Sequence, residues 1–130
     1  MRIFIADDNA EFAEFCAEVA RKDGWSPVLC RDGRELIQAM KREGGPALIL
    51  CDLDMPHLDG TEVARELPDL NGAMRIRFMT GGSDVNALAA RLIAEARDLS
   101  AGRLMLKPIS VAELRKVLHF ERDALNQLRS

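Results

Sequence analysis

Five polar residues of this chain each follow a short apolar run, although they are far apart in the sequence. They are Asp7, Asp8, Asp52, Thr80 and Lys107. Carboxylates that lie close together repel one another, and a hard divalent cation removes that repulsion. Mg²⁺ prefers oxygen ligands and is usually held by one or two carboxylates together with waters and phosphate oxygens. If the fold brings the three acids together, they predict a magnesium site.

Such a site could support phosphoryl transfer. We expect Asp8 and Asp52 to bind the metal directly and Asp7 to bind it through a water. Asp52 could then act as the nucleophile on a phosphoryl group and form an aspartyl phosphate. Lys107 would supply positive charge and Thr80 a hydroxyl donor to the phosphoryl oxygens. Each acid alone could equally cap a helix or a turn, and Lys107 alone could be a solvated lysine.

The elements that must position these residues alternate along the chain. Short apolar runs of strand character recur between segments with helical periodicity. This alternation, with short links, predicts a doubly wound α/β fold with a five-stranded parallel sheet and helices on both faces. Ligands of such folds bind outside the carboxyl ends of the strands, which is where the five polar residues fall. The predicted strands are residues 3–6, 27–30, 47–51, 76–79 and 104–106.

Capping residues mark where several of the predicted helices begin. Asn9 precedes an apolar stripe with a spacing of three and four residues, and Asp32 and Ser110 each open a capping box. The third helix is expected over about 61–67 and the fourth after Ser83. The fifth should run from residue 110 to the end of the chain.

The composition indicates a reduced, cytoplasmic protein of one domain. The chain has 130 residues, of which 48% are hydrophobic and 30% charged, and a net charge of −3. That charge predicts no nucleic-acid binding, and no apolar run is long enough to span a membrane. We see no secretory signal sequence, and the three single cysteines suggest neither a disulfide framework nor a zinc site.

Four motifs in order resemble the receiver domains of two-component response regulators. They are Asp7-Asp8, the stretch from Asp52 to Gly60 that contains Asp54-Met-Pro, Thr80 after its strand, and Lys107-Pro108. One of them alone would be weak evidence, whereas four in the family's order are specific. The resemblance covers residues 1 to about 120 and implies a flavodoxin-like strand order of 2-1-3-4-5.

The resemblance also implies a role for each motif residue. Asp52 is the phosphoacceptor, and Asp7, Asp8, Asp52 and the backbone carbonyl of Asp54 serve Mg²⁺, with Mn²⁺ as a substitute. Thr80 is the switch hydroxyl, and Lys107 binds the phosphoryl group through a cis peptide to Pro108. The implied partners are a sensor histidine kinase or histidine phosphotransfer protein and a downstream protein or output domain. The module would signal in a phosphorelay and catalyse only its own phosphorylation and dephosphorylation.

Two departures from the family pattern raise separate hypotheses. Receivers usually carry Tyr or Phe three residues before the lysine, and here that position is Leu104. We therefore expect phosphorylation to shift the loop at 81–82 and the start of the fourth helix. The Asp52-x-Asp54 spacing also resembles haloacid dehalogenase-like phosphatases, so the Asp54 side chain could activate the water that hydrolyses the aspartyl phosphate.

Two alternative functions and the C-terminal segment remain open at this stage. The alternatives are a phosphohydrolase of that phosphatase class, using Asp52 and Asp54, and a receiver-fold scaffold that is not phosphorylated. Residues 1–120 are expected to form the receiver domain. Residues 121–130 would extend the fifth helix as a dimer contact or the start of a linker, and a homodimer would use helices four and five. We expect either a single-domain regulator or a part of a longer protein.

Overall fold

A parallel β-sheet forms the centre of the molecule. The computed structural model describes residues 1–53, 55, 60–67, 73–81, 85–96 and 100–129. The strands pair in the order β2-β1-β3-β4-β5, with β6 also on β4, and every pairing is parallel. The predicted doubly wound fold and its order of 2-1-3-4-5 are thereby confirmed. The strands are β1 (Arg2–Ala6), β2 (Ser26–Cys30), β3 (Ala47–Asp52), β4 (Met74–Thr80), β5 (Ser100–Ala101) and β6 (Met105–Leu106).

The edge next to β4 differs from the single fifth strand predicted at 104–106. Two short strands, β5 and β6, pair with β4, and residues 102–104 lie between them. Ala101 pairs with Ile76 and Met105 pairs with Met79, so three residues on this edge oppose two on β4. The extra residue interrupts the ladder in the manner of a bulge. The sequence therefore predicted β6 and missed β5.

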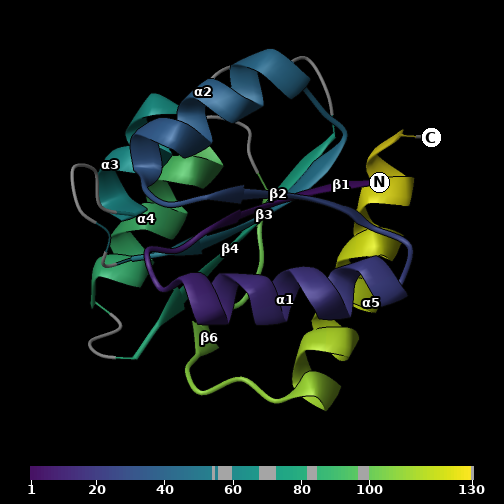
Figure 1. The fold of residues 1–130 in the computed structure, drawn as a ribbon. Coiled ribbons are helices and arrows are strands. Elements are labelled where there is room, and N and C mark those ends of the chain that lie inside the picture. Colours follow the sequence, from purple (N-terminus) through teal and green to yellow (C-terminus); the bar gives the residue numbers. More distant parts are fainter. Residues whose placement is uncertain (54, 56–59, 68–72, 82–84, 97–99, 130) are drawn as a thin grey trace.

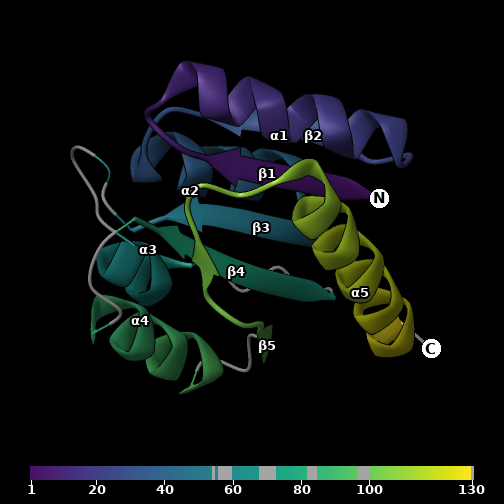
Figure 2. The same cartoon turned by 90° about the horizontal axis from the view of Figure 1, so that it is seen from below.

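Helices cover both faces of the sheet, as Figures 1 and 2 show. Helices α1 and α5 lie on one face, and α2, α3 and α4 lie on the other. Parallel strands need such crossover helices, because each strand must start again at the same end of the sheet. The helices are α1 (Ala10–Lys22), α2 (Gly33–Glu43), α3 (Gly60–Glu66), α4 (Val85–Ala96) and α5 (Val111–Arg129).

The side chains of the central strands alternate between two apolar cores. In β3, Leu48 and Leu50 pack toward α1 and α5, whereas Ile49 and Cys51 pack toward the other three helices. All six residues of β3 are buried, as expected for a central strand covered on both faces. This burial fixes the position of Asp52, the last residue of the strand.

The predicted caps place the starts of three helices. The Asn9 side chain accepts a hydrogen bond from the Phe12 amide at 3.1 Å, and Asp32 accepts one from Glu35 at 2.9 Å. Ser110 Oγ accepts one from the Glu113 amide at 3.1 Å. Each cap satisfies a backbone N–H that the first helical turn leaves without a partner.

Helix α5 packs on the sheet well beyond residue 120. Glu121 and Leu125 are both fully buried, whereas Leu128 is half exposed. The first half of the expected C-terminal extension is thus in contact with the domain core. In the described part of the chain, no helix has the length and apolar character that a membrane span requires.

Candidate functional site

Three carboxylates meet at the carboxyl ends of β1 and β3. One ligand oxygen from each of Asp7, Asp8 and Asp52 lies within 4.8 Å of the other two. Asp7 and Asp52 are buried, and Asp8 is exposed. Strands β1 and β3 are direct neighbours, with Ala6 paired to Cys51, so the residues that follow them emerge side by side. The sheet therefore brings together the three acids that the sequence predicted would hold a metal.

Lys107 reaches into this acidic cluster, although it lies 100 residues beyond Asp7 in the sequence. Its Nζ donates a hydrogen bond to Asp7 Oδ2 at 2.7 Å and lies 3.7 Å from Asp52 Oδ2. The other oxygen of Asp7 accepts a hydrogen bond from the Asn9 amide at 2.9 Å. Asp7 is thus held on both oxygens, one by the start of α1 and one by the lysine. We refer to Asp7, Asp8, Asp52 and Lys107 as the acidic site.

The surroundings of Lys107 keep its ammonium group charged. Burial alone would lower the lysine pKa, but the hydrogen bond to Asp7 and the charges of Asp52 and Asp7 outweigh it and raise the pKa above its usual value. The ammonium also lies 4.5 Å from the centroid of the Phe12 ring. A ring at this distance attracts a cation and limits where the side chain can move.

Phe12 is a member of the site that sequence reasoning missed. It belongs to the apolar stripe of α1, and the stripe was interpreted only as a core-facing surface. The ring is partly buried against the α1–α5 core and also contacts Lys107. The spacing of apolar residues shows which helix face is buried, and it does not show which functional side chain lies over that face.

Thr80 occupies the predicted place at the end of β4. It is 2% exposed, and its carbonyl accepts a hydrogen bond from the Lys107 amide at 3.0 Å. The peptide bond from Lys107 to Pro108 is cis, as the resemblance implied. All five polar residues named first in the sequence therefore lie at the same end of the sheet.

Some expectations fall on residues that the structure does not describe. Asp54, with its backbone carbonyl and its hypothetical role toward water, lies outside the described residues, as do Gly82 and Ser83. Leu104 is described and packs, partly buried, against the core on the α2–α4 face. The packing of Leu104 does not show whether phosphorylation shifts the loop at 81–82, so that expectation stays a prediction.

The cysteines close to the site are unreactive core residues. Burial raises the pKa of the Cys16 thiol to about 12, and the negative charge of Asp7 adds to the increase. Burial likewise raises the pKa of Cys30 to about 12. Because thiolate is the nucleophilic form, neither side chain competes with Asp52 at neutral pH.

A comparison with family models finds a match over most of the chain. The model described as "Response regulator receiver domain" matches residues 3–119. A curated relative, "Response regulator MprA" of Mycobacterium leprae, is 33% identical over 114 residues, which cover 88% of this chain and 47% of the relative. "Sporulation initiation phosphotransferase F" of Bacillus subtilis is 25% identical over 114 residues, covering 88% and 87%. The chain spans about half the length of the MprA relatives.

Solved structures show the same fold. A CheY-like receiver domain protein from Methanospirillum hungatei superimposes with a TM-score of 0.80 at 19% identity and covers 97% of each chain. The response regulator TrrA of Thermotoga maritima, solved in complex with Mg²⁺-BeF, gives a TM-score of 0.74 at 22% identity, covering 92% of this chain and 96% of that one. The matches favour neither the phosphohydrolase nor the scaffold alternative.

Proposed function

The chain belongs to the response regulator receiver domain family, and we propose that Asp52 is the residue on which it accepts a phosphoryl group. Receiver domains of two-component systems are signalling phosphoacceptors. The single observation that carries the assignment to Asp52 is its contact set: two further carboxylates lie within 4.8 Å and the ammonium of Lys107 lies 3.7 Å away. Asp7, the other buried acid of the cluster, accepts hydrogen bonds from the Asn9 amide and from Lys107.

The reaction transfers the phosphoryl group from a donor to a carboxylate oxygen of Asp52. A new P–O bond forms to Asp52 while the bond between phosphorus and the donor atom breaks, and the leaving group takes up a proton. The donor in this family is a histidine kinase or a histidine phosphotransfer protein, so the bond that breaks is a P–N bond to an imidazole. Lys107 stabilises the negative charge on the transferring oxygens because its ammonium is held beside Asp52.

The acidic cluster suits a magnesium ion. Asp8 and Asp52 would bind the metal directly and Asp7 through water, with the Asp54 carbonyl as a further ligand. Bound Mg²⁺ neutralises the developing charge on the phosphoryl oxygens. Three mutually close acids with one lysine have an excess of negative charge, which supports a divalent cation in this place.

Thr80 and the loop after it would transmit the signal. The Thr80 hydroxyl would donate a hydrogen bond to the phosphoryl group and draw the 81–82 loop and the start of α4 toward Asp52. The aspartyl phosphate would thereby change partner affinity. Amide exchange with and without a phosphate mimic would test this step, and unchanged protection across residues 80–90 would count against it.

A hollow beside Lys107 supports docking of the donor protein. A pocket of about 510 Å³ is lined by Phe12, Phe15, Lys107, Pro108 and Ile109. Its apolar wall could bury a donor surface next to the acidic site while the donor histidine approaches Asp52.

The downstream partner, whether a separate protein or an output domain, would recognise the surface at the 81–82 loop and the start of α4, which the phosphoryl group would shift. Residues 121–130 would lead into a linker or contribute to a homodimer through α4 and α5.

The lifetime of the phosphate would depend on Asp54. We propose that its carboxylate activates the water that hydrolyses the aspartyl phosphate. The chain would then catalyse its own dephosphorylation as well as its own phosphorylation, and no other reaction. The Asp54→Asn variant should then hold its phosphate longer than the native chain. An unchanged rate of dephosphorylation would leave Asp54 with the carbonyl role alone.

Intact-mass spectrometry tests the assignment to Asp52. The native chain is incubated with a small acyl phosphate donor, with Mg²⁺ or with EDTA. We expect a single added phosphoryl group with Mg²⁺, none with EDTA, and none on Asp52→Asn. Asp123→Asn, at an exposed acid on α5, is the matched control and should react like the native chain. Equal labelling of Asp52→Asn would refute the assignment.

A further inference from the structure

A second charged cluster lies away from the acidic site, beside β4, β5 and α5. It surrounds a pocket of about 460 Å³. Five cationic side chains line the pocket, in a chain with an overall charge of −3. We call it the basic pocket; its lining includes Arg75, Arg77, Arg91, Arg103, Lys116 and Phe120.

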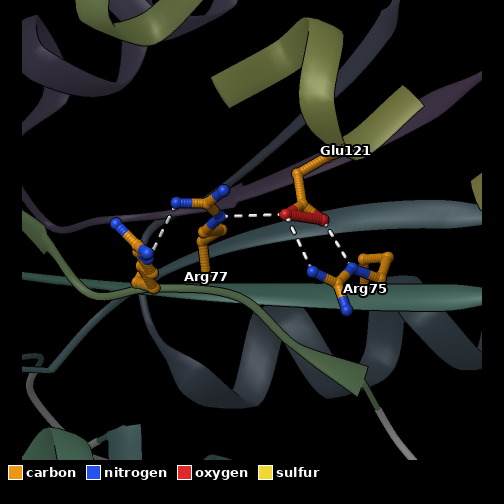
Figure 3. Close-up of polar contacts among 4 residues, drawn as sticks. Arg75, Arg77 and Glu121 are labelled. Atoms are coloured by element: carbon orange, nitrogen blue, oxygen red, sulfur yellow. Dashed lines mark hydrogen bonds and ion pairs between the residues drawn. The ribbon is translucent and has the colours of Figure 1, made fainter. Parts of the chain in front are cut away.

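Two of these arginines are fixed by a buried carboxylate. Arg75 and Arg77 project from β4 toward α5, where Glu121 lies between them, as Figure 3 shows. Arg75 donates to both Glu121 oxygens, at 2.6 and 3.0 Å, and Arg77 Nε donates to one at 3.0 Å. The Glu121 side chain is fully buried, and those of Arg75 and Arg77 are 14% and 10% exposed. The contacts hold both guanidinium groups in place before any ligand binds.

The backbone at Gly102 leaves room for the Arg77 side chain. A Cβ at position 102 would lie 2.8 Å from both Arg77 Cδ and Glu121 Oε1 and would also collide with Arg77 Nε. Gly102 therefore allows the extra residue between β5 and β6 to pass close to the ion pairs. Arg77 Nη1 donates to the Arg103 carbonyl at 3.2 Å, which ties this segment to the pocket wall.

The pocket has more positive charge than its carboxylates can neutralise. Among the described ion pairs, Glu121 serves Arg75 and Arg77, and exposed Glu95 serves Arg91. Within the described part of the chain, neither Arg103 nor Lys116 has an ion-pair partner. Counted over the described residues, the lining carries an excess of three positive charges and favours an anionic ligand.

An aromatic ring completes the lining. Phe120 is 57% exposed, and its ring centroid lies 5.5 Å from the Arg77 guanidinium carbon. An exposed ring beside several cations can stack on a planar group while the cations bind phosphate oxygens. The volume is within the range of small-molecule pockets, about 300–1,000 Å³.

From these contacts we propose that the basic pocket binds a nucleotide. Its phosphates contact the arginines and Lys116, and its base stacks on Phe120. Five cations gather at one pocket of a chain with a net negative charge, which argues for a small ligand and against a nucleic-acid strand. No residue that lines the pocket belongs to the acidic site, so the proposal does not rest on the phosphoacceptor assignment.

Titration of the full chain with ATP in EDTA tests the proposal, because without divalent cations the acidic site repels the nucleotide. We expect saturable amide shifts in ¹⁵N spectra at residues 101–103 and 116–120. The double variant Arg103→Glu/Lys116→Glu should bind ATP about tenfold or more weakly, since each lost contact is a charged hydrogen bond. Both residues are exposed, so the fold should tolerate the change.

Two controls make the result specific. Arg34→Glu/Lys41→Glu alters two exposed cations on α2 by the same charge and should bind ATP like the native chain. Phe120→Leu should weaken ATP binding about fivefold or more and leave pyrophosphate binding unchanged. Asp52→Asn should bind ATP normally, which separates this proposal from the phosphoacceptor assignment.

Four results would overturn the proposal. They are the absence of saturable shifts with ATP, equal loss of affinity in the two double variants, pyrophosphate binding as tight as ATP binding, and tighter binding of a polyglutamate peptide at the same amides. The third would indicate a phosphate site without base recognition. The last would indicate a surface for an acidic protein segment.

Discussion

The acidic site and the basic pocket carry opposite charges at different places on the same sheet. At the carboxyl end of the sheet, three carboxylates face one lysine, and Thr80 ends β4 beside them. Near the start of β4, one carboxylate is shared by two arginines, with further cations around it. Each cluster is only partly neutralised by the chain. Each is therefore prepared for a ligand of the opposite charge, and neither needs a change of fold to receive it.

The two clusters differ in how firmly they are held. Glu121 is fully buried between its arginines, so its ion pairs join β4 to α5 and are part of the domain core. In the acidic site, Asp8 is exposed and Lys107 is partly exposed. Charges in such a position can exchange partners when a metal or a phosphoryl group arrives. We infer that the acidic site is the adjustable cluster and the ion pairs of the basic pocket are a rigid support.

Replacing Glu121 should have the largest effect. The Glu121→Leu variant leaves two poorly exposed guanidinium groups without their carboxylate, and we expect a loss of about 3–5 kcal/mol in the free energy of unfolding. Urea denaturation measures the change. Glu14→Leu removes a carboxylate from an exposed ion pair with Arg21 and should leave the free energy of unfolding nearly unchanged. Similar losses in the two variants would contradict the rigid role of Glu121.

Magnesium should stabilise the protein by binding at the acidic site, and this gain should not depend on the basic pocket. At a concentration of one hundred times its Kd, Mg²⁺ should add about 2.7 kcal/mol to the free energy of unfolding. Asp8→Asn should lose most of this gain because it removes one expected ligand. Glu121→Leu should keep the gain in full, since the clusters are separate. A gain that survives in Asp8→Asn and disappears in Glu121→Leu would reverse our assignment of the two clusters.

A side chain at position 102 should disturb the basic pocket. We expect Gly102→Ala to destabilise the protein by about 1–3 kcal/mol, because the methyl group must displace Arg77 or Glu121. Gly81→Ala is the matched control, since a Cβ there has no atom within 4 Å in the described structure. Thermal unfolding of both variants measures the difference. Equal stability would show that the close approach at Gly102 carries no constraint.

The smallest effect is expected at the edge of the acidic site. Phe12→Leu removes the ring beside the Lys107 ammonium, an interaction of about 0.5–2 kcal/mol. Lys107 should then be less well placed, and phosphorylation by a small acyl phosphate should slow by about two- to thirtyfold. Phe15→Leu, which alters the neighbouring ring, should leave the rate nearly unchanged. Equal rates in Phe12→Leu and the native chain would limit Phe12 to packing.

Residues at strand ends were predictable, and residues that meet between elements were not. Asp7, Asp52 and Thr80 follow apolar runs, and parallel strands place their carboxyl ends at one edge of the sheet, so their meeting follows from local pattern. Arg75 and Arg77 alternate with apolar residues in β4, but Glu121 lies 44 residues beyond Arg77 on a helix. The split of the edge strand at Gly102 likewise depends on side chains from β4 and α5.

The parallel α/β fold, the capped helix starts and the acids that, with Lys107, form the acidic site could all be predicted from the sequence. These features depend on residue types at short spacing and on the rules for joining parallel strands. The folded structure was needed to show that Phe12 lies beside Lys107, that Glu121 is shared by two arginines and that a basic pocket opens next to them. Such contacts depend on the rotation and packing of α1 and α5 against the sheet, which a local pattern of apolar residues does not specify.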